Sequence, residues 1–132
     1  YFTESRAVDA INNVQIAPES VSINNYRQEE ATQQYVNSAS SVDVHSFGYP
    51  YESAKYLVRV VGWNGGVKHS QLTEILVTVD GNDNIAITEY GIVGTNGSAS
   101  SISAGISGTD VQLLVTTANN TSTVTVVGTL VA

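Results

Sequence analysis

Two histidines, His45 and His69, are the side chains in this sequence that could exchange protons near neutral pH. Asp43 precedes His45 by two residues, so a strand at this point would place both side chains on the same face. A hydrolase using such a pair also needs a nucleophile, but no serine lies in a Gly-x-Ser-x-Gly segment. We therefore interpret both histidines as surface or half-buried residues whose ring nitrogens find hydrogen-bond partners.

Glu74 and Glu89 are carboxylates that could act together as the acid and the base or nucleophile of a glycosidase. In a hairpin that turns at residues 80–84, however, Glu74 would lie opposite position 91 rather than position 89. Such a reaction also needs a groove, and the sequence shows no groove-forming insertion. We therefore expect solvated carboxylates on a sheet face, predict no catalytic residues, and predict that the protein is not an enzyme.

The segment Asp80-Gly81-Asn82-Asp83-Asn84 looks like a calcium loop, because its side chains alternate oxygen ligands. A calcium loop starting at Asp80 would need glycine at position 85 and glutamate at position 91, which are Ile85 and Gly91. An Asp-Gly pair between two β-rich runs indicates a hairpin turn instead. The chain also has no cysteine, which removes thiolate ligands. We predict no metal ion and no cofactor.

Trp63, Tyr49 and Tyr51 are the candidate binding residues, because aromatic faces stack on the apolar surfaces of sugars. Tyrosine and tryptophan also fill cores and ordinary protein interfaces. The spacing of these residues does not decide between the two uses.

The composition indicates one domain whose surface is mostly uncharged. The chain has 132 residues, of which 42% are hydrophobic and 13% are charged. Twelve acidic and five basic residues give a net charge of -7, and all the basic residues lie in the first 68 positions. A surface of that sign repels phosphates, so we expect neither nucleic acid nor a membrane as partner. No apolar run approaches the about 20 residues of a membrane span.

From residue 41 onward the sequence predicts an all-β fold. Short runs rich in valine, isoleucine and threonine are separated by turn residues, which is typical of an antiparallel β-sandwich, with a jelly roll as one possible wiring. A loop of small residues is expected from Gly94 to Ser101. The predicted strands are Val42 to Phe47, Ala54 to Val61, Leu72 to Val79, Ile85 to Tyr90, Ile102 to Ile106, Val111 to Thr116 and Thr123 to Val131.

Residues 1–40 differ from residues 41–132, which form the predicted sandwich domain. This first part is rich in Asn, Gln, Ser and Glu and has no sustained period, so it predicts an extended N-terminal arm or linker. Residues 27–36 favour a short helix and a strand about equally. We expect the end of the arm, about Thr32 to Asn37, to join a sheet. Such an arm can lie on a neighbouring subunit.

Four segments carry a resemblance to a known family, and it covers roughly residues 41–131. In order and spacing they resemble a β domain of virion structural proteins from tailed phages, especially marine and cyanobacterial ones. The segments are Tyr51 to Val58, Thr73 to Val77, Ile87 to Gly91 and Val111 to Thr116.

The resemblance implies a structural component of the virion, such as a tail, fibre, neck or capsid-surface protein, with no catalytic residues to carry over. Its partners would be other virion proteins and further copies of itself, with a trimer favoured by analogy to fibre-like proteins. The alternative is a receptor- or carbohydrate-binding module at a fibre tip. It would bind a host surface glycan through the loops near Trp63 and from Gly94 to Ser101.

Overall fold

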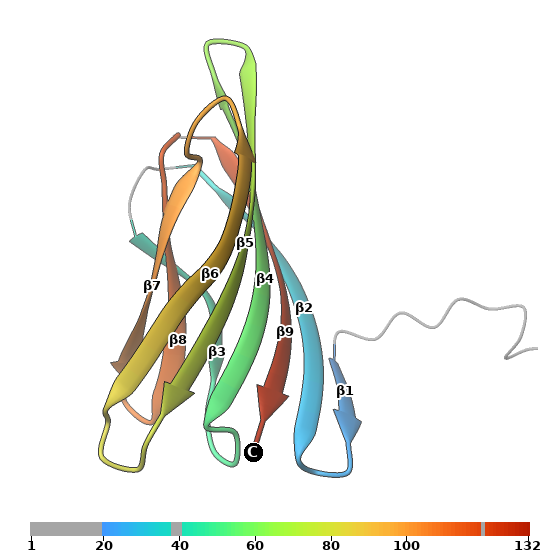
Figure 1. The fold of residues 1–132 in the computed structure, drawn as a ribbon, viewed down its shortest axis with the longest axis vertical. Helices are drawn as coiled ribbons and strands as arrows, with labels where there is room; N and C mark the ends of the chain where they lie inside the picture. Colours follow the sequence, from blue (N-terminus) through green and yellow to red (C-terminus); the bar gives the residue numbers. More distant parts are fainter. Residues whose placement is uncertain (1–19, 38–40, 120) are drawn as a thin grey trace, which may run out of the picture.

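The computed structural model describes residues 20–37, 41–119 and 121–132, which form two antiparallel β-sheets packed face to face (Figure 1). Among these residues no helix is long and apolar enough to cross a membrane. The strands are β1 (Ser20–Ile23), β2 (Arg27–Val36), β3 (Ser41–Phe47), β4 (Ser53–Asn64), β5 (Val67–Val79), β6 (Ile85–Thr95), β7 (Ser100–Ser107), β8 (Asp110–Thr117) and β9 (Ser122–Val131).

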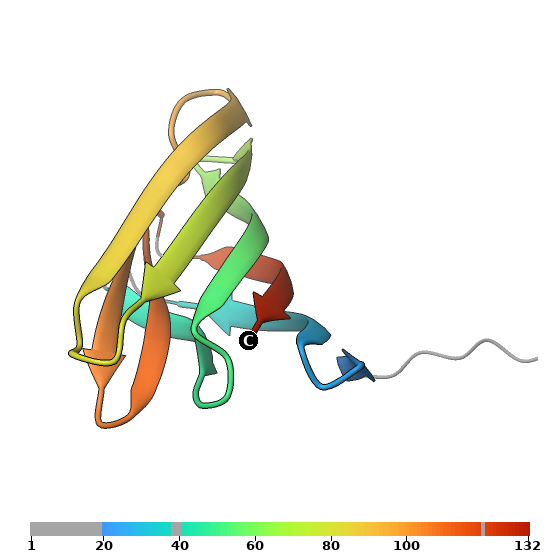
Figure 2. The ribbon, with the colours of Figure 1, turned by 60° about the horizontal axis from the view of Figure 1, so that its bottom comes forward.

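The large sheet has the strand order β1-β2-β9-β4-β5-β6, and the small sheet has the order β3-β8-β7. The neighbours β2 and β9 lie in the large sheet, and the strands next to them in sequence, β3 and β8, are neighbours in the small sheet. Two adjacent strands therefore cross together from one sheet to the other, which is a jelly-roll-like feature. Figure 2 shows the strong twist of the large sheet, with β6 and β2 pointing in different directions.

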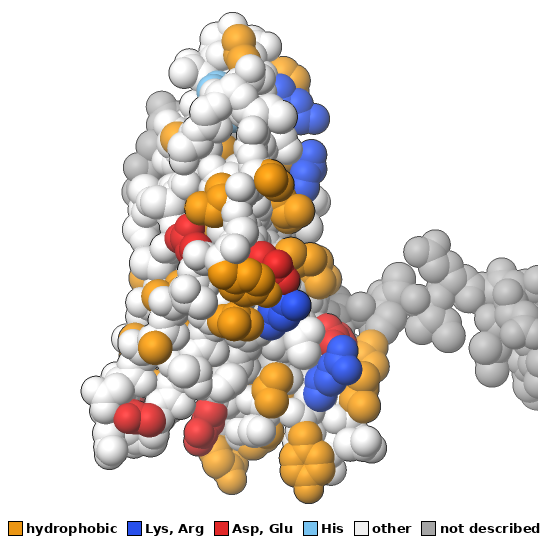
Figure 3. Space-filling view, viewed as in Figure 1, with side chains coloured by type: hydrophobic (Ala, Val, Ile, Leu, Met, Phe, Trp, Pro, Cys, Tyr) orange, Lys and Arg blue, Asp and Glu red, His pale blue; other side chains and the backbone are white. Residues whose placement is uncertain are grey.

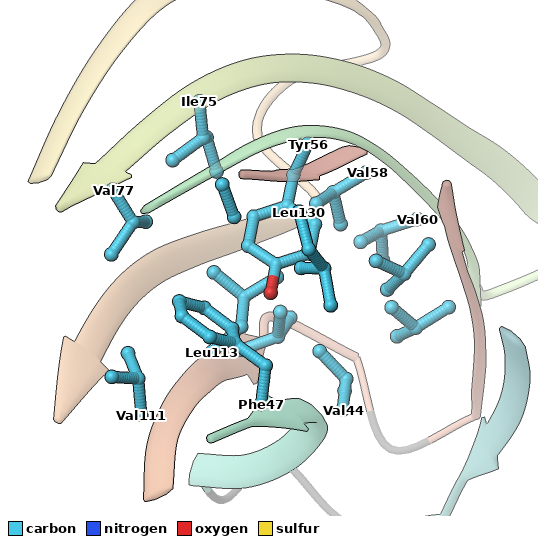
Figure 4. Packing of buried hydrophobic residues seen from close by; sticks show 14 of the residues in the cluster. Val44, Phe47, Tyr56, Val58, Val60, Ile75, Val77, Val111, Leu113 and Leu130 are labelled. Atoms are coloured by element: carbon cyan, nitrogen blue, oxygen red, sulfur yellow. The ribbon is translucent and has the colours of Figure 1, made fainter. Parts of the chain in front are cut away.

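The core lies between the sheets because every second residue of the central strands is apolar and points inward. In β4, Tyr56 and Val58 are fully buried while their neighbours Lys55, Leu57 and Arg59 are exposed. Figure 4 shows that Tyr56 projects from the large sheet into the middle of this cluster. Burying one such side chain stabilises a fold by about 1.5 to 3 kcal/mol, so this alternation fixes which face of the sheet is covered.

The predicted all-β sandwich is confirmed, and the strands predicted after residue 41 are all present. The structure extends β6 to Thr95, whereas the sequence predicted a loop from Gly94 onward. Glycine in a strand weakens it but does not end it, and here Gly94 pairs with Gln71 of β5.

The predicted boundary at residue 40 does not coincide with an edge of the sandwich. Strands β1 and β2 fall within the predicted arm, yet both belong to the large sheet. Strand β2 pairs with β9 over its whole length, from Arg27 opposite Val131 to Val36 opposite Ser122. The expectation that the end of the arm joins a sheet is confirmed, and the partner strand is in the same chain. The remainder of the predicted arm, residues 1–19 and 38–40, lies outside the described residues.

Candidate functional site

The three candidate binding residues do not lie together. Tyr49 and Tyr51 follow β3 at the lower end of the sandwich in Figure 1, whereas Trp63 is near the far end of β4. Ten residues of strand separate Ser53 from Trp63, a span of about 33 Å. Tyr49 is 93% exposed and Trp63 is 51% exposed, while Tyr51 is half-buried and donates a hydrogen bond to Gln28. No common aromatic platform forms from these three side chains.

Trp63 lies at the upper end of the sandwich, where the β4–β5 and β6–β7 connections come together (Figure 1). The ammonium nitrogen of Lys68 lies 6.0 Å from the centroid of the Trp63 ring. Asn96 of the β6–β7 connection donates a hydrogen bond to the Lys68 carbonyl at 2.8 Å. This end therefore presents a half-exposed indole, a cation and amide groups, which are suitable contacts for a polar ligand.

His45 is buried, whereas the sequence predicted a surface or half-buried histidine, and its surroundings were not foreseen. Its Nε2 contacts the carboxylate of Glu30, and its Nδ1 lies 2.8 Å from the Tyr56 hydroxyl. Burial, and then the charges of Glu30 and Asp43, raise the pKa of Tyr56, so this phenol stays protonated and donates to His45. These contacts fasten β2 and β3 to the core through charged and polar groups.

The prediction that Asp43 and His45 share a face is wrong. A β-bulge between these residues inserts Val44 as an extra residue, so Val44 and His45 are both buried while Asp43 is exposed and accepts a hydrogen bond from Gln112. His69 lies on β5, and its Nδ1 is buried without a hydrogen-bond partner in the described part of the chain. The two histidines therefore share no site.

Glu74 and Glu89 do not form an acid–base pair. Glu74 lies opposite Gly91, as the hairpin register predicted, and a bulge follows, so Glu89 lies opposite the buried Ile75 and Glu74 points to the other side of the sheet. Glu74 instead forms an ion pair of 3.0 Å with Lys55. Two carboxylates on opposite faces of a sheet cannot flank one glycosidic bond.

A small polar cluster surrounds Glu74 on the exposed side of the large sheet. A hydrogen bond from Tyr90, then one from Lys55, holds the pKa of Glu74 below its ordinary value. The same contacts raise the pKa of Lys55, chiefly through Glu74, and the pKa of Tyr90. All three groups thus keep their ordinary charge at neutral pH, and as exposed groups they are screened by water.

The Asp80 segment forms the predicted hairpin turn. The Asp80 carboxylate accepts hydrogen bonds from the backbone of Asn82 and Asn84 and from the Asn84 side chain. These bonds, the Asn84 side chain first, lower the pKa of Asp80. The oxygens that a cation would need are therefore used to close the turn. No group of three or more potential metal ligands occurs within the residues that the structure describes.

The side of the large sheet that faces away from the small sheet carries many exposed side chains, and we call it the outer face. It consists of the side chains of β2, β9, β4, β5 and β6 that point away from the small sheet, and it faces the viewer in Figure 3. Hydrophobic side chains gather in its middle, and basic ones line one side (Figure 3). Its exposed apolar residues include Leu57, Leu72, Leu76, Tyr90, Val93 and Val127.

No family model matches this sequence, and no curated protein matches it. Among solved structures, the chain is similar to the tailspike protein of Acinetobacter phage vB_ApiP_P1, with a TM-score of 0.53 and 19% identity over 77% of this chain and 22% of that chain. This chain therefore shares its fold with part of that tailspike protein. At this identity the likeness shows the fold alone.

Two further tailspike structures are similar at lower TM-scores. That of Acinetobacter baumannii phage AM24 has a TM-score of 0.47 and 9% identity over 80% of this chain and 26% of that chain. The tailspike protein gp49 of Acinetobacter baumannii bacteriophage Fri1 is described as a capsular polysaccharide depolymerase. It has a TM-score of 0.49 and 16% identity over 96% of this chain and 21% of that chain. The chain thus spans about a quarter or less of the tailspikes it matches.

The prediction that this protein is not an enzyme is contradicted by these likenesses. One of the tailspikes is described as a depolymerase, which is an enzyme. The prediction was drawn from the residues of this chain alone, and the likeness to the first tailspike covers only 22% of that protein. The likeness shows a shared fold and does not distinguish marine or cyanobacterial phages from others.

Proposed function

We propose that this chain is a β domain of a tailspike or tail-fibre protein, which serves in the virion by self-assembly and by contact with other virion proteins. The observation that carries the proposal is the tailspike fold over 77% of the chain, at a TM-score of 0.53. The proposal includes a homo-oligomer, with a trimer as the state favoured by analogy, and a source among marine or cyanobacterial tailed phages, which rests on the sequence resemblance alone.

The surface of the sandwich supports a role in protein contact. Leu72 and Leu76 on β5 and Val127 on β9 are all more than 40% exposed on the outer face. Contiguous exposed apolar residues of this kind mark interaction surfaces in soluble proteins.

Immunogold electron microscopy on particles of the phage that encodes the chain tests this proposal. Antibodies raised against residues 20–132 are expected to label the end of the tail, because tailspikes and fibres are tail components. Antibodies against the major capsid protein of the same phage provide the control, because they should label the head only. Gold on the capsid, or particles that carry no label, would contradict the tail assignment.

A second candidate function is recognition of a host surface glycan by the upper end of the sandwich. The half-exposed Trp63, Lys68 and the β6–β7 connection lie together there, which favours this end over the one that carries Tyr49 and Tyr51. An indole stacked on a sugar contributes about 1 kcal/mol or more, so Trp63→Ala is expected to reduce binding on a glycan array about tenfold.

Tyr26→Ala is the matched control for this experiment, because Tyr26 is 72% exposed in the turn between β1 and β2 at the opposite end. It should leave glycan binding unchanged. Equal loss in both variants, or binding that Trp63→Ala does not alter, would exclude a site at the upper end.

A further inference from the structure

The charges of the sandwich are divided between its surfaces. All four basic residues that the structure describes lie on strand positions of the outer face, where they accompany only two carboxylates. The six charged residues of the outer face are Arg27, Lys55, Arg59, Lys68, Glu29 and Glu74. The outer face thus carries a net charge of +2, from four cations less two anions.

On the remaining surface of the described residues, all the charged side chains are carboxylates. Their number is seven, which gives this part a net charge of -7, and they are Glu30, Asp43, Glu52, Asp80, Asp83, Glu89 and Asp110. On the outer face, Lys55 and Arg27 are paired with Glu74 and Glu29, at 3.0 and 2.5 Å. Within the described part, Arg59 makes no ion pair. Arg59 is therefore available to an external carboxylate.

The edges of the large sheet are protected against pairing with another chain. The edge strand β1 has only four residues. The other edge strand, β6, contains the bulge after Tyr90 and places the charged Glu89 on the inward side. Short strands, bulges and inward-pointing charges are the devices by which sheet edges avoid edge-to-edge association. The outer face has no such protection, so association is directed to the face rather than to the edges.

The outer face has the size and shape of a protein interface. Five strands spaced by about 4.8 Å, over a length of about 33 Å, give roughly 800 Å². A standard interface buries about 800 Å² per partner. The face also contains an open hollow of about 410 Å³, lined mainly by apolar atoms of residues such as Leu76, Ala86 and Val131. A hollow of this kind can accept one large side chain of a partner.

We propose that a second copy of this chain docks on the outer face through one of its own acidic surfaces. Two outer faces placed against each other would bring +2 against +2, whereas an outer face against the remaining surface of the described residues brings opposite charges together. The contact is therefore heterologous, with different patches on the two copies, and such contacts repeated around an axis give a closed ring. This inference rests on the self-assembly in the proposed function and names the surface that performs it.

Glu89 is the carboxylate best suited to the other side of this contact. It is exposed on β6 between Ile87 and Ile92, which are 37% and 57% exposed. Its patch thus combines an acid with apolar neighbours, as the outer face combines Arg59 with Leu72. The two patches are complementary in both charge and hydrophobicity.

The test is the mass of the full 132-residue chain by light scattering over a range of concentrations. The wild type is expected to form a defined oligomer. Leu72→Asp combined with Leu76→Asp removes two apolar contacts and places two anions against an acidic partner surface, so it should raise the Kd at least about tenfold.

Ser101→Asp combined with Ser103→Asp is the matched control, because it adds the same charge to exposed positions of β7 on the far sheet. It should leave the mass unchanged, and thermal unfolding should show that both variants fold. Added salt should weaken the wild-type association, and Arg59→Gln should reduce this salt dependence.

A monomeric wild type would overturn the inference, and so would an unchanged mass in the leucine variant, equal dissociation of the control variant, or an association that salt strengthens. These results are independent of immunogold labelling. Labelled tails together with a monomeric chain would contradict docking on the outer face and support the tail assignment. An oligomer without tail labelling would contradict the tail assignment and support the docking.

Discussion

Replacing Gly128 by alanine is expected to lower the free energy of unfolding by about 3 kcal/mol, because an added methyl group would overpack the core. A Cβ at this position would lie 2.8 and 2.9 Å from Cε1 and Cδ1 of the Tyr56 ring. The ring cannot move aside, because Tyr56 is fully buried and its hydroxyl is held by His45. Chemical denaturation of the purified chain measures the effect.

Gly91→Ala is the control for this prediction. Gly91 is also a strand glycine, but a Cβ there would meet only the Cβ of Glu74, at 4.0 Å, which is an ordinary contact. Its stability should stay within about 0.5 kcal/mol of the wild type, or rise slightly because alanine has less backbone freedom to lose. A similar loss in both variants would show that strand propensity, and not contact with Tyr56, controls the cost.

Replacing Gln71 by leucine is expected to cost about 3 kcal/mol, because it leaves several buried polar groups without partners. The Gln71 side chain is buried in β5, and its carbonyl oxygen accepts hydrogen bonds from the backbone of Ala99 and Ser100, at 2.8 and 3.3 Å. Its amide nitrogen donates to Thr73 and to Ser100. One side chain thus fixes the start of β7 to the large sheet.

Amide hydrogen exchange distinguishes a local from a global effect of Gln71→Leu. Ala99 and Ser100 should lose protection first, because their amides bond directly to the deleted group. Gln112→Leu serves as the control, since Gln112 bonds to Asp43 at an exposed position and should change stability by less than about 0.5 kcal/mol. If the Ala99 amide stays protected in the leucine variant, the hydrogen bond to Gln71 does not hold this segment.

The strands after residue 41 were predictable because their inward positions are apolar and their turns contain glycine, asparagine or aspartate. Only the end of strand β2 was predicted, since its inward positions include Gln28, Glu30 and Thr32. These side chains bond to Tyr51, to His45 and to the Val44 carbonyl instead of entering the apolar core. A strand that attaches through polar contacts shows no hydrophobic alternation, so its sequence looks like that of a linker.

The face of the sheet on which an individual side chain lies was less predictable than the strands themselves. A bulge adds one residue and reverses every later assignment of inward and outward. The bulge at Val44 separated His45 from Asp43, and the one at Tyr90 separated Glu89 from Glu74. The outer face could not be recognised from the sequence either, because leucines and valines occur on both faces of these strands, in the core and on the exposed side. Only the sheet order shows which side is covered.

The position of β9 in the large sheet determines when this chain can fold. The last strand lies between β2 and β4, so Arg27 pairs with Val131 across 104 positions of sequence. Contacts of such high contact order slow folding, because the intervening chain must be closed into a loop first. During synthesis the large sheet stays incomplete until β9 has left the ribosome. A nascent chain exposes the unpaired backbone edges of β2 and β4 until then, so the risk of aggregation is greatest in the interval before β9 emerges.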